Sequence, residues 1–358
     1  MRIVRPTFPD LNEFAADFAE ALDNGRVTNN GEHVQEFERA LTEYLDCPTL
    51  VFSSGQTALM TMLAAAGVKD GDVICPSFTF CGTPHAIEWA GAMPIFSDID
   101  DTLCLDGNKI RCSRRTKAIL AVEPYGIRCD SFLLAAVAKA QNIPLLIDSA
   151  PAFGSHPIID TESKARIFSF HATKPFSTME GGALCSHDPE FFEVAAEIRN
   201  FGQDDKGDCF HVGLNGKMME VCALIGRQQL KSWPATVKQR NANAILLAKE
   251  LSNIEGVRVV STPKDQRPIW TYFPILITED FGKSRDEVMI KLAQKNIQTR
   301  KYYLPAHQMT CYQHMNCVLP VTDMVAAQVI SLPFYSDMER GEIAYMAEAI
   351  RQIQSESL

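Results

Sequence analysis

The 358-residue sequence has no Cys-x-x-Cys pair and no uncharged apolar run that approaches the ~18 residues of a membrane span. The first absence argues against a zinc site or a redox cysteine pair, and the second argues against a transmembrane helix. Basic residues are in the minority, with 34 lysines and arginines against 44 aspartates and glutamates and a net charge of −10. Without a basic field to displace counterions, neither nucleic acid nor an anionic membrane is an expected partner.

The N-terminal stretch MRIVRPTFPDLNEF lacks an apolar core of signal-peptide length, and acidic residues occur early, at Asp10 and Glu13. The 11 cysteines are scattered through segments predicted as strands and helices, which is typical of cysteines used as small hydrophobic residues. Unpaired thiols are typical of a reducing compartment, so the sequence predicts a cytoplasmic protein.

The sequence does contain an ordinary globular composition, 46% hydrophobic and 22% charged, in which helical and β-rich segments alternate. This alternation predicts an α/β fold with a mostly parallel sheet, covered on both faces, that binds ligands at the carboxyl ends of its strands. A largely helical stretch follows at 218–254, interrupted near Trp233 and Pro234. We predict a large domain over residues 1–240 and a smaller α+β domain over residues 241–358. Helices are expected at residues 11–23, 33–45, 56–66, 82–90, 131–141, 284–295 and 340–353, and strands at 49–52, 72–75, 93–96 and 167–170.

Two strand ends carry residue types suited to a charged ligand. The stretch SSGQTAL follows a predicted strand and opens a helix, so that small residues such as Gly55 let backbone N–H groups approach an anion. An ordinary turn is the alternative. In LLIDSAPAFG, Asp148 ends an apolar strand. Its carboxylate either caps a following helix or pairs with a protonated ring nitrogen.

The stretch SFHATKPFSTMEGGAL contains one lysine, Lys174, shortly after a strand-like run. A solvated loop lysine is the ordinary explanation, but a Schiff-base lysine needs the rigid pocket that a strand-end loop provides. A further stretch, GLNGKMMEVCALIG, places Asn215 and Lys217 before an amphipathic helix. A phosphate cradle, an acid for a pyridinium nitrogen and a lysine for an aldehyde are together the requirements of pyridoxal phosphate, which is the cofactor we predict.

Segments spread over almost the whole chain match one enzyme family in their residues and in their order along the chain. They are VTNNGEHVQEFERAL (27–41), SSGQTAL (53–59), GDVICPSFTFCGTPHAI (71–87), GAMPIFSDID (91–100), IDSAPAFG (147–154), SFHATKPFSTMEGGAL (169–184), GLNGKMMEVCALIGRQQL (213–230), QTRKYYLPAH (298–307) and ISLPFYSDM (330–338). In these segments the sequence resembles the DegT/DnrJ/EryC1/StrS family of sugar aminotransferases. The resemblance implies a pyridoxal-phosphate enzyme of fold type I, the aspartate-aminotransferase-like fold, with no metal.

The resemblance gives roles to individual residues. Lys174 resembles the lysine that forms the Schiff base with the cofactor, and Asp148 resembles the acid that keeps the pyridine nitrogen protonated. Phe80 matches the aromatic residue that stacks on the cofactor ring. The phosphate contacts carried over are the backbone of Gly55 and Gln56 and the hydroxyl of Ser169.

Other positions concern the subunit partner and departures from the family. Asn215 matches a residue that reaches into the neighbouring subunit's site, which implies a homodimer with shared active sites. An ordinary helix N-cap is the alternative for Asn215. Many relatives have threonine in place of Gln56, and Pro151 stands where relatives often have glutamine or histidine near the ring hydroxyl. Lys217 stands where many have arginine, and an ammonium cannot form a bidentate pair.

The substrate contacts are less well specified by the sequence. Tyr302, Tyr303 and His307 are candidates to line the nucleotide side of the site, and His85 is a candidate to face the sugar. Packing in the core or at the rim is the alternative for both tyrosines. His171 receives no chemical role.

The implied reaction transfers an amino group from an amino acid, with glutamate expected, to a nucleotide-linked 4-keto-6-deoxy sugar for polysaccharide or deoxysugar biosynthesis. The sequences of the SFHATK and NGKM segments resemble those of members that aminate carbon 4 of the sugar. Amination of carbon 3 is an alternative. A fold-type-I lyase or decarboxylase also stays open, because the sequence does not say whether Arg300 or Arg227 points inward to bind a substrate carboxylate. A third alternative is a sensor that binds the cofactor without catalysis. The nucleotide, whether dTDP, UDP or GDP, is not specified.

Overall fold

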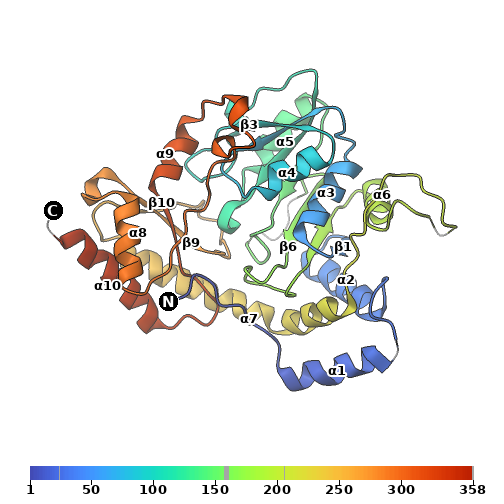
Figure 1. Ribbon diagram of the computed structural model, residues 1–358, viewed down its shortest axis with the longest axis horizontal. Helices are drawn as coiled ribbons and strands as arrows, with labels where there is room; N and C mark the ends of the chain where they lie inside the picture. The colour runs from blue at the N-terminus through green and yellow to red at the C-terminus, as the bar shows by residue number, and fades with distance from the viewer. Residues whose placement is uncertain (24, 157–160, 205, 357–358) are drawn as a thin grey trace.

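The computed structural model describes residues 1–23, 25–156, 161–204 and 206–356. A seven-stranded sheet forms its centre, a three-stranded sheet lies toward one end, and the long helix α7 connects the two parts (Figure 1). The helices are α1 (Leu11–Asp23), α2 (Glu32–Leu45), α3 (Gly55–Ala65), α4 (Gly82–Trp89), α5 (Ser131–Ala140), α6 (Pro189–Arg199), α7 (Glu220–Leu251), α8 (Arg285–Gln294), α9 (Pro320–Gln328) and α10 (Arg340–Ser355). The strands are β1 (Thr49–Phe52), β2 (Asp72–Pro76), β3 (Met93–Ser97), β4 (Thr116–Val122), β5 (Leu145–Asp148), β6 (Ala165–Ser169), β7 (Gly182–Cys185), β8 (Val257–Val259), β9 (Phe273–Ile277) and β10 (Val329–Leu332).

The central sheet has the strand order β1-β7-β6-β5-β4-β2-β3. The neighbours from β6 to β3 pair in parallel, whereas β7 pairs antiparallel with both β1 and β6. The predicted mostly parallel sheet is therefore confirmed, with β7 as its exception. The chain between β6 and β7, residues 170–181, forms turns and bends and contains no helix of the kind that usually makes a parallel crossover.

Successive residues of the central strands enter cores on opposite faces of the sheet. In β4, Ala118 and Leu120 belong to the core that contains Leu59 of α3. Ile119, between them, belongs to a second core that contains Leu134 of α5 and extends into the smaller unit. Burial on both faces explains why these strands are nearly continuous apolar runs in the sequence.

The smaller unit contains the antiparallel sheet β10-β9-β8, packed with α8 and α10 in one apolar core. The N-terminal segment lies against this unit: the N–H of Gln298 donates to the carbonyl of Met1 at 3.0 Å, and Arg5 pairs with Asp337 at 3.1 Å. The boundary predicted at residue 240 falls inside α7 and remains a proposal.

The predicted interruption of the long helix at Pro234 is wrong, because α7 is continuous through this residue. Trp233 is buried, and its ring stacks on Phe153 with 5.7 Å between centroids. We attribute the continuity to this packing, which anchors the helix where proline removes one backbone donor. Although α7 has 32 residues, none of the described helices, α7 included, is apolar enough to cross a membrane.

Candidate active site

A cavity of about 370 Å³ opens at the carboxyl ends of β4, β5 and β6, between the N-terminus of α3 and residues of the smaller unit. This is the edge of a parallel sheet at which ligands bind. The cavity brings together eight of the predicted site residues from distant segments: Gly55, Gln56, Phe80, Asp148, Ser169, Lys174, Tyr302 and Tyr303.

Lys174 lies in the loop between β6 and β7 and lines the cavity. Backbone hydrogen bonds fix this loop: the N–H of Phe170 donates to the carbonyl of Gly181, and the N–H of Lys174 donates to that of His171, both at 2.8 Å. Burial lowers the pKa of Lys174 to about 8, an effect that the nearby Asp148 carboxylate opposes. The amine is therefore neutral, and nucleophilic, in roughly a tenth of the molecules at pH 7, far more than for a lysine with its ordinary pKa.

Asp148 lies at the end of β5 and is 5% exposed. Its Oδ2 accepts a hydrogen bond from Thr83 Oγ1 at 2.8 Å, and its Oδ1 accepts one from the N–H of Ala150 at 3.0 Å. Burial raises the pKa of Asp148, while these two hydrogen bonds and the charge of Lys174 lower it. The helix-cap alternative for Asp148 is wrong, because the described residues that follow it, 149–156, form turns and no helix.

A second threonine extends the hydrogen bonding below Asp148. The hydroxyl oxygens of Thr79 and Thr83 lie 2.7 Å apart, and both side chains are buried. Because the Thr83 hydroxyl donates its proton to Asp148, the Thr79 hydroxyl must donate to Thr83. The two threonines therefore form a directed chain that ends on the carboxylate. Neither was predicted from the sequence.

The N-terminus of α3 provides a place for an anion. The helix begins at Gly55 and is capped by Ser54, whose Oγ accepts from the N–H of Thr57 at 3.1 Å. The N–H groups of Gly55 and Gln56 belong to the first turn, which has no intrahelical acceptors for them. The helix dipole favours negative charge at this end, so a phosphate group fits here.

The close approach of α3 to β6 requires glycine at position 55. A Cβ atom at Gly55 would lie 2.7 Å from the Cβ of Ser169, the last residue of β6. The same approach brings the Ser169 hydroxyl to the cavity beside the helix end. The Gln56 side chain donates from Nε2 to the carbonyl of Gly82 at 3.1 Å, so the residue's backbone N–H is its contribution to the anion site.

Aromatic rings form much of the remaining cavity wall. Phe80 is 60% exposed, and a planar ligand ring could cover this phenyl group. From the smaller unit, Tyr272 and Tyr302 contribute rings with 5.1 Å between centroids, and Tyr303 lies 5.6 Å from Tyr302. The two tyrosines considered from the sequence thus pack together and also line the cavity. Pro151 lines it as well.

The structure places the two candidate histidines away from the cavity. The Nδ1 of His85 lies 2.7 Å from the hydroxyl of Tyr312, and the Nδ1 of His307 lies 2.7 Å from Ser77 Oγ. Within the described chain, neither histidine is part of the cavity lining. The described residues also contain no group of three or more His, Cys, Asp or Glu side chains that could bind a metal ion.

Asn215 and Lys217 also lie apart from their own chain's cavity, in the segment before α7. Asn215 is exposed. The Nζ of Lys217 donates to Asn200 Oδ1 at 2.9 Å and lies 4.4 Å from the ring centroid of Phe201. Burial and the nearby Arg199 charge lower the pKa of Lys217.

Several cavity residues were not assigned a role from the sequence. Tyr272 and Thr173 line the cavity, and so do His171 and Glu180, whose Nε2 and Oε1 atoms lie 3.5 Å apart. The positions of His171 and Glu180 within the lysine segment could have suggested them. Tyr272, which is contributed by another segment, had no comparable signal.

A lysine with a lowered pKa, a buried carboxylate and an anion site at a helix N-terminus, on a mostly parallel sheet, define a pyridoxal-phosphate enzyme of fold type I. The chain belongs to the DegT/DnrJ/EryC1/StrS aminotransferase family, whose model matches residues 10–351. The family confirms the predicted fold, cofactor and enzyme class: the protein is a pyridoxal-phosphate-dependent aminotransferase.

Individual relatives are similar over nearly the full length. The chain is 34% identical over 364 residues to a dTDP-4-amino-4,6-dideoxy-D-glucose transaminase of Shigella dysenteriae, covering 98% of both chains. It is 28% identical to a GDP-perosamine synthase of Escherichia coli O157:H7, covering 94% of both. Among solved structures, DesI in the presence of its TDP-sugar product aligns with a TM-score of 0.93 and 30% identity, covering 99% of this chain and 93% of DesI.

Proposed function

We propose that this protein transfers an amino group from an amino acid, with glutamate expected, to carbon 4 of a nucleotide-linked 4-keto-6-deoxy sugar. The observation that carries the proposal is the placement of Lys174 and Asp148 in one cavity with the anion site of α3. The relatives named as a dTDP-amino-sugar transaminase and a GDP-perosamine synthase, and the DesI structure with a TDP-sugar product, support a sugar nucleotide as substrate.

The cofactor fits the residues present, since the N-terminus of α3 at Gly55 suits its phosphate and the exposed Phe80 ring suits its planar ring. Pyridoxal phosphate supplies an aldehyde and a ring that accepts the electron pair released when a substrate C–H bond breaks. In our proposal the Asp148 carboxylate keeps the ring nitrogen of the cofactor protonated. The phosphate is bound by the backbone of Gly55 and Gln56 together with the Ser169 hydroxyl.

Lys174 Nζ has the second chemical role in this proposal. In its neutral form it would take the proton from the α-carbon of the amino donor and deliver it to the reactive carbon of the cofactor. In the second half-reaction it would carry a proton from that carbon to carbon 4 of the sugar. A positioned base of this kind typically accelerates a reaction by ~10²–10⁴-fold. The lowered pKa of about 8 supports this role, because it leaves the amine partly unprotonated at neutral pH.

For the sugar nucleotide we propose Tyr302 and Tyr303 as contacts, supported by their place in the cavity wall. His85 and His307 stay candidates without that support, because their ring nitrogens face Tyr312 and Ser77.

We further propose a homodimer in which Asn215 and Lys217 complete the partner's site. Both residues lie outside the cavity of their own chain. The surrounding segment carries exposed apolar side chains, including Phe210 and Val212, that a second copy of the chain could cover. An N-cap role for Asn215 lacks support, because α7 begins at Glu220 with Met219 as its cap residue.

We propose a cytoplasmic location and a role in polysaccharide or deoxysugar biosynthesis. The eleven free cysteines, several of them buried, support a reducing compartment.

The test follows the absorbance of the bound cofactor. Glutamate should convert it to the amine form. After the keto acid has been removed, a 4-keto sugar nucleotide should restore the original spectrum. The acceptors are dTDP-, UDP- and GDP-linked 4-keto sugars, and the Lys174→Ala protein is the control. Product amination at carbon 3 would correct the position, decarboxylation of the amino acid would favour the lyase class, and no conversion with any amino donor would contradict amino transfer.

A further inference from the structure

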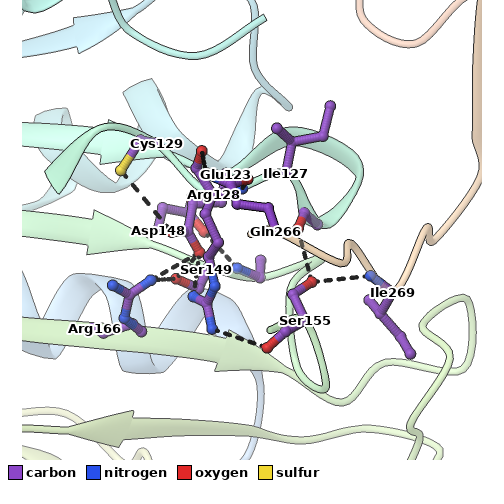
Figure 2. A network of polar contacts seen from close by, with 12 residues as sticks. Glu123, Ile127, Arg128, Cys129, Asp148, Ser149, Ser155, Arg166, Gln266 and Ile269 are labelled. Carbon is purple, nitrogen blue, oxygen red and sulfur yellow. Dashed lines mark hydrogen bonds and ion pairs between the residues drawn. The ribbon is translucent and has the colours of Figure 1, made fainter. Parts of the chain in front are cut away.

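A buried charge cluster lies next to Asp148, at the carboxyl end of β4 (Figure 2). Its centre is Glu123, which is 1% exposed. One oxygen of this carboxylate, Oε2, accepts hydrogen bonds from Arg128 Nη1 and from Ser149 Oγ, both at 2.7 Å, and forms an ion pair with Arg166 Nη1 at 2.8 Å. Two guanidinium groups and one carboxylate therefore meet at this point, all of them buried.

The cluster is joined directly to the residue that carries the functional carboxylate. The N–H of Glu123 donates to the carbonyl of Asp148 at 3.0 Å. Ser149, the next residue in the chain, bonds to Glu123 and also accepts from Arg166 Nη1 at 2.6 Å. The end of β5 is thus fixed by its backbone on one side and by a side chain on the other.

The same cluster reaches the segment that leads to Tyr272 in the cavity wall. The backbone N–H of Arg128 donates to Gln266 Oε1 at 3.2 Å, and Gln266 Nε2 donates back to the Arg128 carbonyl at 3.1 Å. Ser155 Oγ accepts from the N–H of Ile269 at 3.0 Å (Figure 2). Polar contacts therefore connect the end of β5, which carries Asp148, with the segment that carries Tyr272.

Buried ion pairs are often no more stabilising than apolar residues of the same size, so fold stability alone explains this cluster poorly. We propose that Glu123 is a positioning residue for the aminotransferase reaction: its carboxylate gathers two arginines and a serine at the end of β5, fixes the position of Asp148 and contributes to the electrostatic field around it.

The charge effect has a definite sign. Glu123 lies close enough to Asp148 for its charge to oppose ionisation of that carboxylate, and Asp148 in turn acts on Lys174. Removing the charge of Glu123 leaves two arginines and makes the field at the site more positive, which lowers the pKa of nearby groups. Removing one arginine takes away a positive charge, makes the field at the site more negative and raises the pKa of those groups. Among the described residues, the charged and titratable groups that face Glu123 or Asp148 include Arg128, Arg166, Cys129, Lys174 and Tyr303.

The experiment compares Glu123→Gln with Arg166→Met in the cofactor-loaded protein. The readout is the pH at which the bound cofactor changes its absorbance. We expect this midpoint to fall in Glu123→Gln and to rise in Arg166→Met, each by about 0.6–1.2 pH units, the size that Coulomb's law gives for a unit charge roughly 10 Å away at an effective dielectric constant of about 20–40. In cofactor-free protein, the pH dependence of Lys174 labelling by an amine reagent should shift in the same two directions.

Asp72→Asn is the matched control. Asp72 is also a largely buried carboxylate paired with an arginine, Arg115, at 3.2 Å, but it begins β2 and lies at the other end of the strands. Its loss should leave both midpoints unchanged. A purely structural role for Glu123 predicts that the midpoint shifts in the same direction in Glu123→Gln and Arg166→Met. Shifts of the same sign would overturn the proposal, and so would unchanged midpoints in folded protein. If Glu123→Gln does not fold, as judged by circular dichroism, Arg166→Met and Arg128→Met decide: an upward shift supports the proposal, and no shift overturns it.

Discussion

The hydrogen bond from Thr83 to Asp148 provides the sharpest quantitative prediction. Replacing Thr83 with valine preserves the shape of the side chain and removes the hydroxyl that donates to Asp148 Oδ2 at 2.8 Å. Asp148 then keeps the N–H of Ala150 as its remaining donor among the hydrogen bonds described above. The Thr79 hydroxyl, which donates to Thr83, loses its acceptor in the same substitution.

The size of the expected pKa shift follows from the energy of a hydrogen bond to a charged group. A hydrogen bond to a charged group contributes about 1.5–3 kcal/mol, and one pKa unit corresponds to about 1.4 kcal/mol. The bond stabilises the ionised form, so its loss adds to the burial effect that already raises the pKa of Asp148. We expect a further rise of about one to two units in Thr83→Val.

The assay is the pH dependence of kcat/KM, which reports the ionisation of groups in the free enzyme. The acid limb should move to higher pH by about one to two units in Thr83→Val, and activity below the limb should fall ~10-fold or more. Thr83→Ser keeps the hydroxyl and is the control, with an unchanged limb. Thr79→Val should cause a smaller shift of the same sign. If a folded Thr83→Val protein has the limb of the unmodified enzyme, the reasoning about Asp148 is refuted.

Four further predictions concern the cofactor and the dimer. Lys174→Ala should lose the covalent link to the cofactor, which borohydride reduction and peptide mapping would detect, and should lose more activity than the ~10²–10⁴-fold of a general base. Asp148→Asn should retain the cofactor by absorbance but slow kcat ~10²-fold or more, because an amide cannot stabilise the ring charge. Gly55→Ala should weaken cofactor binding by about 1–3 kcal/mol in an equilibrium titration, since its Cβ would meet β6 at 2.7 Å. Lys174→Ala mixed with an Asn215→Ala/Lys217→Ala double variant should regain activity when subunits exchange, because one site of the mixed dimer then carries both defects and the other site is intact.

Each of these predictions has an outcome that contradicts it. A reduced adduct on another lysine would remove the assignment of Lys174. Near-normal turnover in Asp148→Asn would place the ring-nitrogen partner elsewhere. Unchanged cofactor affinity in Gly55→Ala would exclude the close approach at α3. For the mixed dimers, no recovery despite confirmed exchange, or an active monomer, would exclude the shared site.

Much of the fold and the centre of the site could be predicted from the sequence because their signals are local. The central strands are short apolar runs buried on both faces, and turns and helices separate them in a regular order. Asp148 is the last residue of β5 and Lys174 lies in the loop after the parallel neighbour β6, so the parallel arrangement brings them to one edge. Gly55 stands where a strand gives way to a helix, which is the ordinary position of an anion site.

The tertiary structure decided the features that depend on contacts between distant segments. The hydrogen bond between Thr83 and Asp148 joins residues 65 positions apart, and the pairing that takes His85 out of the cavity joins it to Tyr312, 227 positions away. The reversed strand β7 and the convergence of Arg166 on Glu123 likewise depend on which strands become neighbours in the sheet. A side chain's own sequence neighbourhood carries no record of these partners, because packing brings them together only after the strands and helices have found their places.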